Sequence, residues 1–84
     1  IQNPVACKVL SAVLQDCSDD TMVRHEAAES LGAIGDPSAV QVLESFVNDP
    51  AAEVADTCKL SLELIRWRTG RQGYGQGRAV CVWA

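Results

Sequence analysis

The segment TMVRHEAAESLGAIGDP, from Thr21 to Pro37, has the pattern of one helix that ends in a turn and is followed by the start of another. Its apolar residues recur at the spacing that gathers them on one face of a helix. They are Val23, Ala27, Leu31 and Ile34. Gly35 is the residue type that most readily adopts the left-handed conformation at a helix end. Asp36 then offers an N-cap acceptor before Pro37, whose missing N–H is tolerated in a first helical turn.

A second copy of this pattern lies further along the chain. VLSAVLQD at Val9–Asp16 matches VLESFVND at Val42–Asp49, and VRHEAAESLGAI at Val23–Ile34 matches VADTCKLSLELI at Val54–Ile65. A two-helix unit of roughly 30 residues is typical of an α-solenoid, in which each hairpin buries its apolar face on its neighbours. The sequence therefore predicts an all-α chain of α-hairpin repeats, with about two helix pairs.

The periodicity predicts helices over Pro4–Asp16, Asp20–Ile34, Pro37–Asn48 and Ala51–Trp67. The stripe expected on the first of them consists of Val5, Val9, Leu10, Val13 and Leu14. We expect residues 1–67 to form a partial repeat domain and the Gly- and Arg-rich residues 68–84 to form a disordered tail. Two units are fewer than the roughly three that a stable array needs. Since the chain also begins with Ile1 rather than Met, we expect a fragment of a longer protein.

Charge and cysteine spacing narrow the classes of function. The net charge is −4, and the acidic residues all precede the basic stretch that starts at Arg66. An acidic body disfavours nucleic acid as a partner, because phosphate binding requires clustered Lys and Arg. No apolar run approaches the roughly 20 residues of a membrane helix, so no membrane interaction is expected. The four cysteines lack the close spacing of zinc and redox motifs, which favours reduced thiols in a cytoplasmic protein. They are Cys7, Cys17, Cys58 and Cys81.

The pair His25-Glu26 is not required by repeat packing, because the second unit has Asp56 and Thr57 at the aligned positions. At about 100° per residue, a helical wheel places His25 on the side opposite the apolar stripe. Gly32 and Ala33 lie on the same non-core side. Because both are small, we expect them to leave open space in which another group could approach the helix closely.

An imidazole beside a carboxylate offers donors that suit iron or zinc. Two donors from one helix make at most part of a coordination shell, and the chain contains no other histidine. Two interpretations of His25 and Glu26 therefore stay open on the residues alone: a metal-ligand pair, or a solvent-facing polar pair on a solenoid ridge. Glu29, one turn later, is interpreted as a solvated surface acid rather than as a group that orients the ring.

The stretch MVRHEAAESLGAIGDPSAVQVLESFVNDPAAEVADTCKLSLELI resembles the closing repeats of the deoxyhypusine hydroxylase family, di-iron monooxygenases built of HEAT-like repeats. The resemblance extends over Pro4–Trp67, and MVRHEAAESLGAIGDP is its most specific part. It implies that His25 and Glu26 are metal ligands, the last of four His-Glu pairs around two irons, with no catalytic residue beyond the ligands. With three pairs absent, this chain alone is expected to be inactive.

The resemblance also implies the reaction and the partners. The cofactor is a di-iron (Fe2+) centre with O2 as co-substrate, and the protein substrate is a translation initiation factor that bears deoxyhypusine, which is hydroxylated to hypusine in the cytoplasm. Two alternatives share the repeat pattern. One is a non-catalytic HEAT-repeat scaffold that binds a partner protein, and the other is a HEAT-like phycobilin lyase. Metal binding separates the hydroxylase from both.

Overall fold

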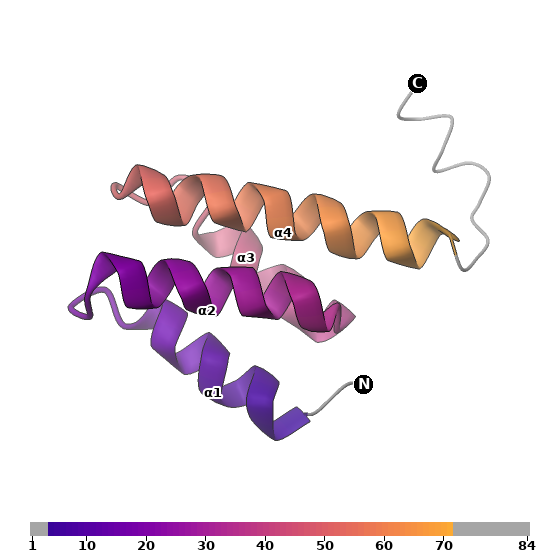
Figure 1. The fold of residues 1–84 in the computed structure, drawn as a ribbon, viewed down its shortest axis with the longest axis horizontal. Helices are drawn as coiled ribbons and strands as arrows, with labels where there is room; N and C mark the ends of the chain where they lie inside the picture. The colour runs from indigo at the N-terminus through magenta and orange to yellow at the C-terminus, as the bar shows by residue number, and fades with distance from the viewer. Residues whose placement is uncertain (1–3, 72–84) are drawn as a thin grey trace.

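A computed structural model describes residues 4–71. In this range the chain is helical, and it contains no strand, which confirms the all-α prediction. The elements in order are α1 (Pro4–Gln15), α2 (Thr21–Ile34), the 3-10 helix η1 (Pro37–Ala39), α3 (Val40–Ser45) and α4 (Ala52–Arg71). Figure 1 shows α2 beside α4, with α1 along the other side of α2 and α3 behind the pair. Among the described helices none is long and apolar enough to cross a membrane.

The turn chemistry of the central segment is as predicted. Asp20 caps α2 by accepting a hydrogen bond from the Met22 N–H at 2.7 Å. Gly35 ends α2 in the left-handed region with φ 77°, and its N–H donates to the Leu31 carbonyl. The Asp36 carboxylate then accepts from the Ser38 N–H at 3.0 Å, which lowers the pKa of Asp36. These local contacts fix where the first hairpin ends and the second begins.

The second hairpin departs from the predicted helix bounds at both helices. The helix expected over Pro37–Asn48 is divided into η1 and α3, and it ends at Ser45 because tight turns follow, with the Phe46 N–H bonded to the Leu43 carbonyl. Helix α4 continues past Trp67, where its end was expected, and two arginines join its last turns to neighbouring elements. Arg66 Nη2 lies 2.6 Å from Glu44 Oε2, and Arg68 Nη1 donates to the Ala33 carbonyl at 2.9 Å. The rest of the expected tail, residues 72–84, lies outside the described residues.

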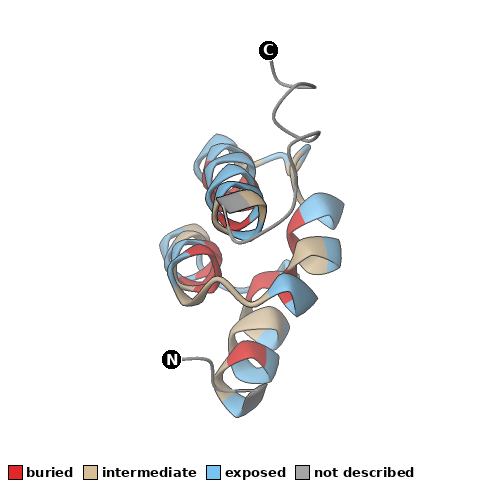
Figure 2. Cartoon of the chain, turned by 90° about the vertical axis from the view of Figure 1, so that its right-hand side faces the viewer, coloured by how far each residue is buried: buried red, intermediate tan, exposed pale blue. Residues whose placement is uncertain are grey.

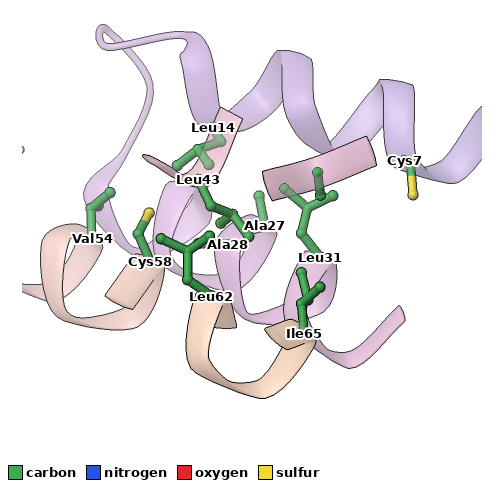
Figure 3. Packing of buried hydrophobic residues seen from close by; sticks show 11 residues of the cluster. Cys7, Leu14, Ala27, Ala28, Leu31, Leu43, Val54, Cys58, Leu62 and Ile65 are labelled. Atoms are coloured by element: carbon green, nitrogen blue, oxygen red, sulfur yellow. The ribbon is translucent and has the colours of Figure 1, made fainter. Parts of the chain in front are cut away.

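Helix α2 packs against α1 on one side and α4 on the other, and α4 also packs on α3. Viewed along the long axis, the buried faces of the helices turn inward toward one another (Figure 2). The close-up in Figure 3 shows side chains from all four helices meeting in one core. Its buried members are Cys7, Leu14, Ala27, Ala28, Leu31, Ala39, Leu43, Val54, Cys58, Leu62 and Ile65.

The apolar faces predicted for α1 and α2 were wrong in part. On α1, Val5 and Val9 are exposed, whereas Cys7 and Leu14 are buried, because α1 packs mainly on the one side that faces α2. On α2, Val23 is exposed. The residues that α2 buries are Arg24, Ala27, Ala28, Leu31 and Gly32. Because α2 has a neighbour on each of two sides, its buried surface is wider than the single arc given by the helical wheel.

The cysteines among the described residues form no disulfide bond, and the extent to which each is buried predicts how fast its thiol reacts. Burial raises the pKa of the Cys58 thiol to about 11. It also raises the pKa of Cys7, with a further contribution from the nearby Asp36 carboxylate. Cys17 is exposed, and Cys81 lies outside the described residues.

We expect iodoacetamide to modify Cys17 in the native chain and to reach Cys58 at least about 100-fold more slowly, because a thiol pKa of about 11 is far above the usual value of about 8.5. Peptide mapping by mass spectrometry separates the sites, and unfolding in urea should remove the difference. Equal native rates at Cys17 and Cys58 would contradict the packing described here.

Candidate metal-ligand pair on helix α2

The surface along which α2 and α4 meet, here called the α2–α4 seam, carries the candidate site. The two helices run in the same direction, so the contacts ascend together in residue number. His25 contacts Thr57, Ala28 and Gly32 contact Ser61, and Ala33 contacts Arg68. Small or hydroxyl-bearing residues on both helices allow this close approach, which places polar groups of one repeat against those of the next.

The open space expected at Gly32 was a wrong prediction, because α4 fills it, whereas Ala33 is exposed as expected. A Cβ atom added at Gly32 would lie 2.6 Å from Ser61 Cβ and 2.9 Å from Ser61 Cα, closer than real Cβ contacts allow. The Ser61 hydroxyl donates to the Ala28 carbonyl at 2.8 Å in a buried position. What approaches closely at Gly32 is therefore the next repeat of the chain itself.

His25 lies at the edge of the α2–α4 seam rather than facing away from the neighbouring helices, as the wheel had indicated. Its side chain is 30% exposed, and its Nδ1 lies 2.7 Å from the hydroxyl of the buried Thr57. The reason for the difference is that α4 packs against the side of α2 that the wheel assigned to solvent. One imidazole nitrogen is thus bonded within the fold.

The other imidazole nitrogen faces the outer surface of α2. Nε2 lies 3.9 Å from Glu29 Oε1, one helical turn later, a separation too long for a hydrogen bond. The Glu29 side chain is 70% exposed, which agrees with its interpretation as a solvated surface acid. Glu26, the neighbour of His25, is also exposed. The side chains of His25, Glu26 and Glu29 are therefore all at least partly accessible to solvent.

The donor chemistry fits part of a metal shell. Nε2 of His25 makes no hydrogen bond within the described residues, and Glu26 adds a carboxylate on the same helix. Within residues 4–71, no three His, Cys, Asp or Glu side chains gather into a group that could hold a metal ion. His25 and Glu26 can therefore contribute two donors, and a complete site needs further donors from outside this range.

Arg24, immediately before His25, anchors the start of α2, and its burial was not predicted from the apolar pattern. Its guanidinium forms an ion pair with Asp49 at 2.7 Å, its Nε donates to the Leu14 carbonyl at 2.9 Å, and it lies 5.5 Å from the Phe46 ring centroid. The hydrogen bond from Arg24 lowers the pKa of the Asp49 carboxyl. Arg24 thus ties both hairpins to the helical turn that presents His25.

Comparison with known proteins agrees with the repeat architecture. The profile of the HEAT-repeat family matches residues 1–63. A Drosophila pseudoobscura pseudoobscura protein named deoxyhypusine hydroxylase is 45% identical over 73 residues, which is 86% of this chain and 24% of that protein. The human protein of the same name is 46% identical over 67 residues, 80% of this chain and 22% of that protein.

A solved structure is similar as well. The structure of human deoxyhypusine hydroxylase in complex with glycerol matches with a TM-score of 0.81 and 42% identity, over 90% of this chain and 26% of that chain. The present chain therefore spans about a quarter of the length of the proteins it matches.

Proposed function

The chain belongs to the HEAT-repeat family, and from this premise we propose that it is a segment of a deoxyhypusine hydroxylase that supplies one His-Glu ligand pair to a di-iron centre. The observation that carries the proposal is the 45% identity over 86% of this chain to a relative of that name, well beyond what the repeat pattern alone requires. The activity belongs to the whole protein, of which this segment is about a quarter, and we expect the segment alone to be inactive.

In this proposal His25 binds iron through Nε2 and Glu26 binds through its carboxylate. The support is geometric, because Nδ1 is engaged by Thr57, and Nε2 and Glu26 lie on the accessible side of α2. The iron pair, when bound, supplies the O2 chemistry that hydroxylates a deoxyhypusine side chain. Arg24 keeps the first turn of α2 fixed through its bond to Asp49, and so keeps both donors in place.

The substrate and location follow from the same proposal. The protein substrate is a translation initiation factor that carries deoxyhypusine, which the reaction converts to hypusine. The acidic body of the segment suits a protein partner rather than a nucleic acid. We place the protein in the cytoplasm, a location supported by the unpaired thiols of Cys7, Cys17 and Cys58.

The test is His25→Ala in the complete hydroxylase that carries this segment. We expect iron affinity to fall by at least the roughly 10–100-fold that even outer-shell changes cost, with hydroxylation lost. Far-UV circular dichroism should stay unchanged, because the half-buried ring makes one hydrogen bond in the fold. Iron content is measured by elemental analysis, and hydroxylation by mass spectrometry of the substrate.

Asp56→Asn is the matched control, because Asp56 is exposed and occupies the position of His25 in the second repeat. This variant should bind iron and hydroxylate as the unchanged protein does. Wild-type iron stoichiometry in His25→Ala would show that His25 is not a ligand. Absence of iron from the unchanged protein would favour a non-catalytic scaffold.

A further inference from the structure

We propose that Thr57 is the positioning residue for His25: its hydroxyl, supplied by the next repeat, accepts the Nδ1–H of the ring and so leaves Nε2 as the donor to metal. The part that concerns metal rests on the proposed function. The part that concerns the ring and its tautomer rests on the contact between α2 and α4 alone.

The contact has the geometry of a strong, specific hydrogen bond. Nδ1 and Oγ1 are 2.7 Å apart, and the residues are separated by 32 positions in the sequence, so the contact depends on tertiary structure. Thr57 is buried against α2, so its hydroxyl is fixed by packing. A ring that is bonded at one nitrogen and packed at the edge of the α2–α4 seam has a defined orientation.

The direction of this hydrogen bond decides whether the ring can bind a metal. A neutral imidazole carries one N–H, and the other nitrogen is an acceptor. If Nδ1 donates to Thr57, the lone pair of Nε2 is free. A threonine hydroxyl oxygen can accept a hydrogen bond as well as donate one, so it can accept the Nδ1–H. The exposed carboxylate of Glu29 lies 3.9 Å from Nε2, which favours a cation there.

The repeat alignment gives this arrangement a structural logic. Thr57 occupies, in the second unit, the position that Glu26 occupies in the first. Because α4 stacks along α2 in the same direction, that position comes to face the histidine of the preceding unit. One position of the repeat thus supplies a ligand in one unit and, in the next, the group that orients a ligand.

The first measurement is the tautomer of His25 in the metal-free chain. The chain contains one histidine, so its imidazole nitrogen signals in a 15N NMR spectrum belong to His25 alone. In mildly alkaline buffer, where imidazole is neutral, we expect the Nδ1–H form. Thr57→Val keeps the branched shape but removes the hydroxyl, and it should shift the population toward the Nε2–H form. Thr57→Ser keeps the hydroxyl and should behave as the unchanged chain.

The second measurement is iron affinity in the complete hydroxylase that carries this segment. We expect Thr57→Val to lower the affinity by roughly 10–100-fold, the usual effect of losing a partner behind a metal-bound histidine, and Thr57→Ser to restore it. Thermal unfolding of each variant shows whether the substitution destabilises the fold in general. General destabilisation would lower the iron affinity of Thr57→Val but would leave the tautomer of the folded protein unchanged.

The outcomes separate this inference from the proposed function. An Nε2–H form in the unchanged chain, or a Thr57→Val variant with the unchanged tautomer and affinity, would overturn the inference. Thr57→Val could shift the tautomer as expected while the complete protein never binds iron. That result would confirm that Thr57 orients the ring and would overturn the proposed function instead.

Discussion

Arg24→Met is expected to destabilise the chain by about 3–5 kcal/mol, the usual cost of removing one partner from a buried ion pair. The side chains of Arg24 and Asp49 are only 5% and 4% exposed, and the guanidinium also satisfies the Leu14 carbonyl. Methionine fills similar space but leaves the Asp49 carboxylate buried without a counter-charge. Urea unfolding followed by circular dichroism measures the change, which is a large fraction of the total stability of a small domain.

Arg66→Met is the matched control for this variant. The ion pair of Arg66 with Glu44 is as short, at 2.6 Å, but both side chains are 50% exposed. Exposed pairs contribute about 0–1 kcal/mol, so this variant should be nearly as stable as the unchanged chain. Pairing Arg24→Met with Asp49→Leu should recover much of the loss, because no buried charge remains. Equal stability of Arg24→Met and Arg66→Met would contradict the buried pair.

The acid dependence of stability gives a second readout of the same pair. The pKa of Asp49 is lowered in the folded chain, chiefly by its hydrogen bond from Arg24. The stabilisation is therefore present above the ordinary aspartate pKa of about 4 and is lost as the pH falls toward the folded-state value. The stability difference between the unchanged chain and Arg24→Met should accordingly shrink in acid.

Gly32→Ala should also destabilise the chain, although alanine is by about 1 kcal/mol the better helix former. The new methyl group would meet both the side chain and the backbone of Ser61, so the helices must separate. Overpacking of this kind costs about 1–3 kcal/mol and should exceed the gain in helix propensity. The free energy of unfolding, again from urea titration, measures the balance.

Gly70→Ala should change the free energy of unfolding in the opposite direction and serves as the control. A Cβ atom at Gly70 meets nothing within 4 Å, so this variant should gain stability, by less than the roughly 0.5–1 kcal/mol of a position in the middle of a helix because Gly70 lies in the last turn of α4. In a Ser61→Gly background, Gly32→Ala should cost less, because the closest side-chain atoms are gone. If Gly32→Ala stabilised the chain as Gly70→Ala is expected to, that result would contradict the close approach of α2 and α4 at Gly32.

The sequence predicted those features that depend on local chemistry. The end of α2 at Gly35 and the cap at Asp36 need only their own residues, and both are present in the structure. The repeat unit was visible because apolar spacing survives in both copies. The two-sided packing of α2 was not predictable in this way, because Gly32 and Ser61 make a close contact without being hydrophobic. Arg24 was missed because a charged residue does not register in an apolar pattern.

The candidate site was predictable only in part for a related reason. His25 and Glu26 were identified by their unusual pairing and by family resemblance, both of which are properties of one segment. Thr57 lies in another repeat, and nothing in its local sequence distinguishes it from other helical threonines. Its contact with His25 depends on the stacking of α4 on α2. The one available signal was its alignment with Glu26, which gains meaning only once the stacking direction is known.

The bond between His25 and Thr57 has a consequence for how such proteins evolve by duplication. The repeating unit of the sequence is one hairpin, but the surroundings of His25 are completed only by a helix of the next hairpin. A newly inserted copy would bring its own histidine while changing the neighbour that supports the histidine before it. The two units of this chain are therefore not interchangeable, because exchanging the second would remove the hydrogen-bond partner of His25.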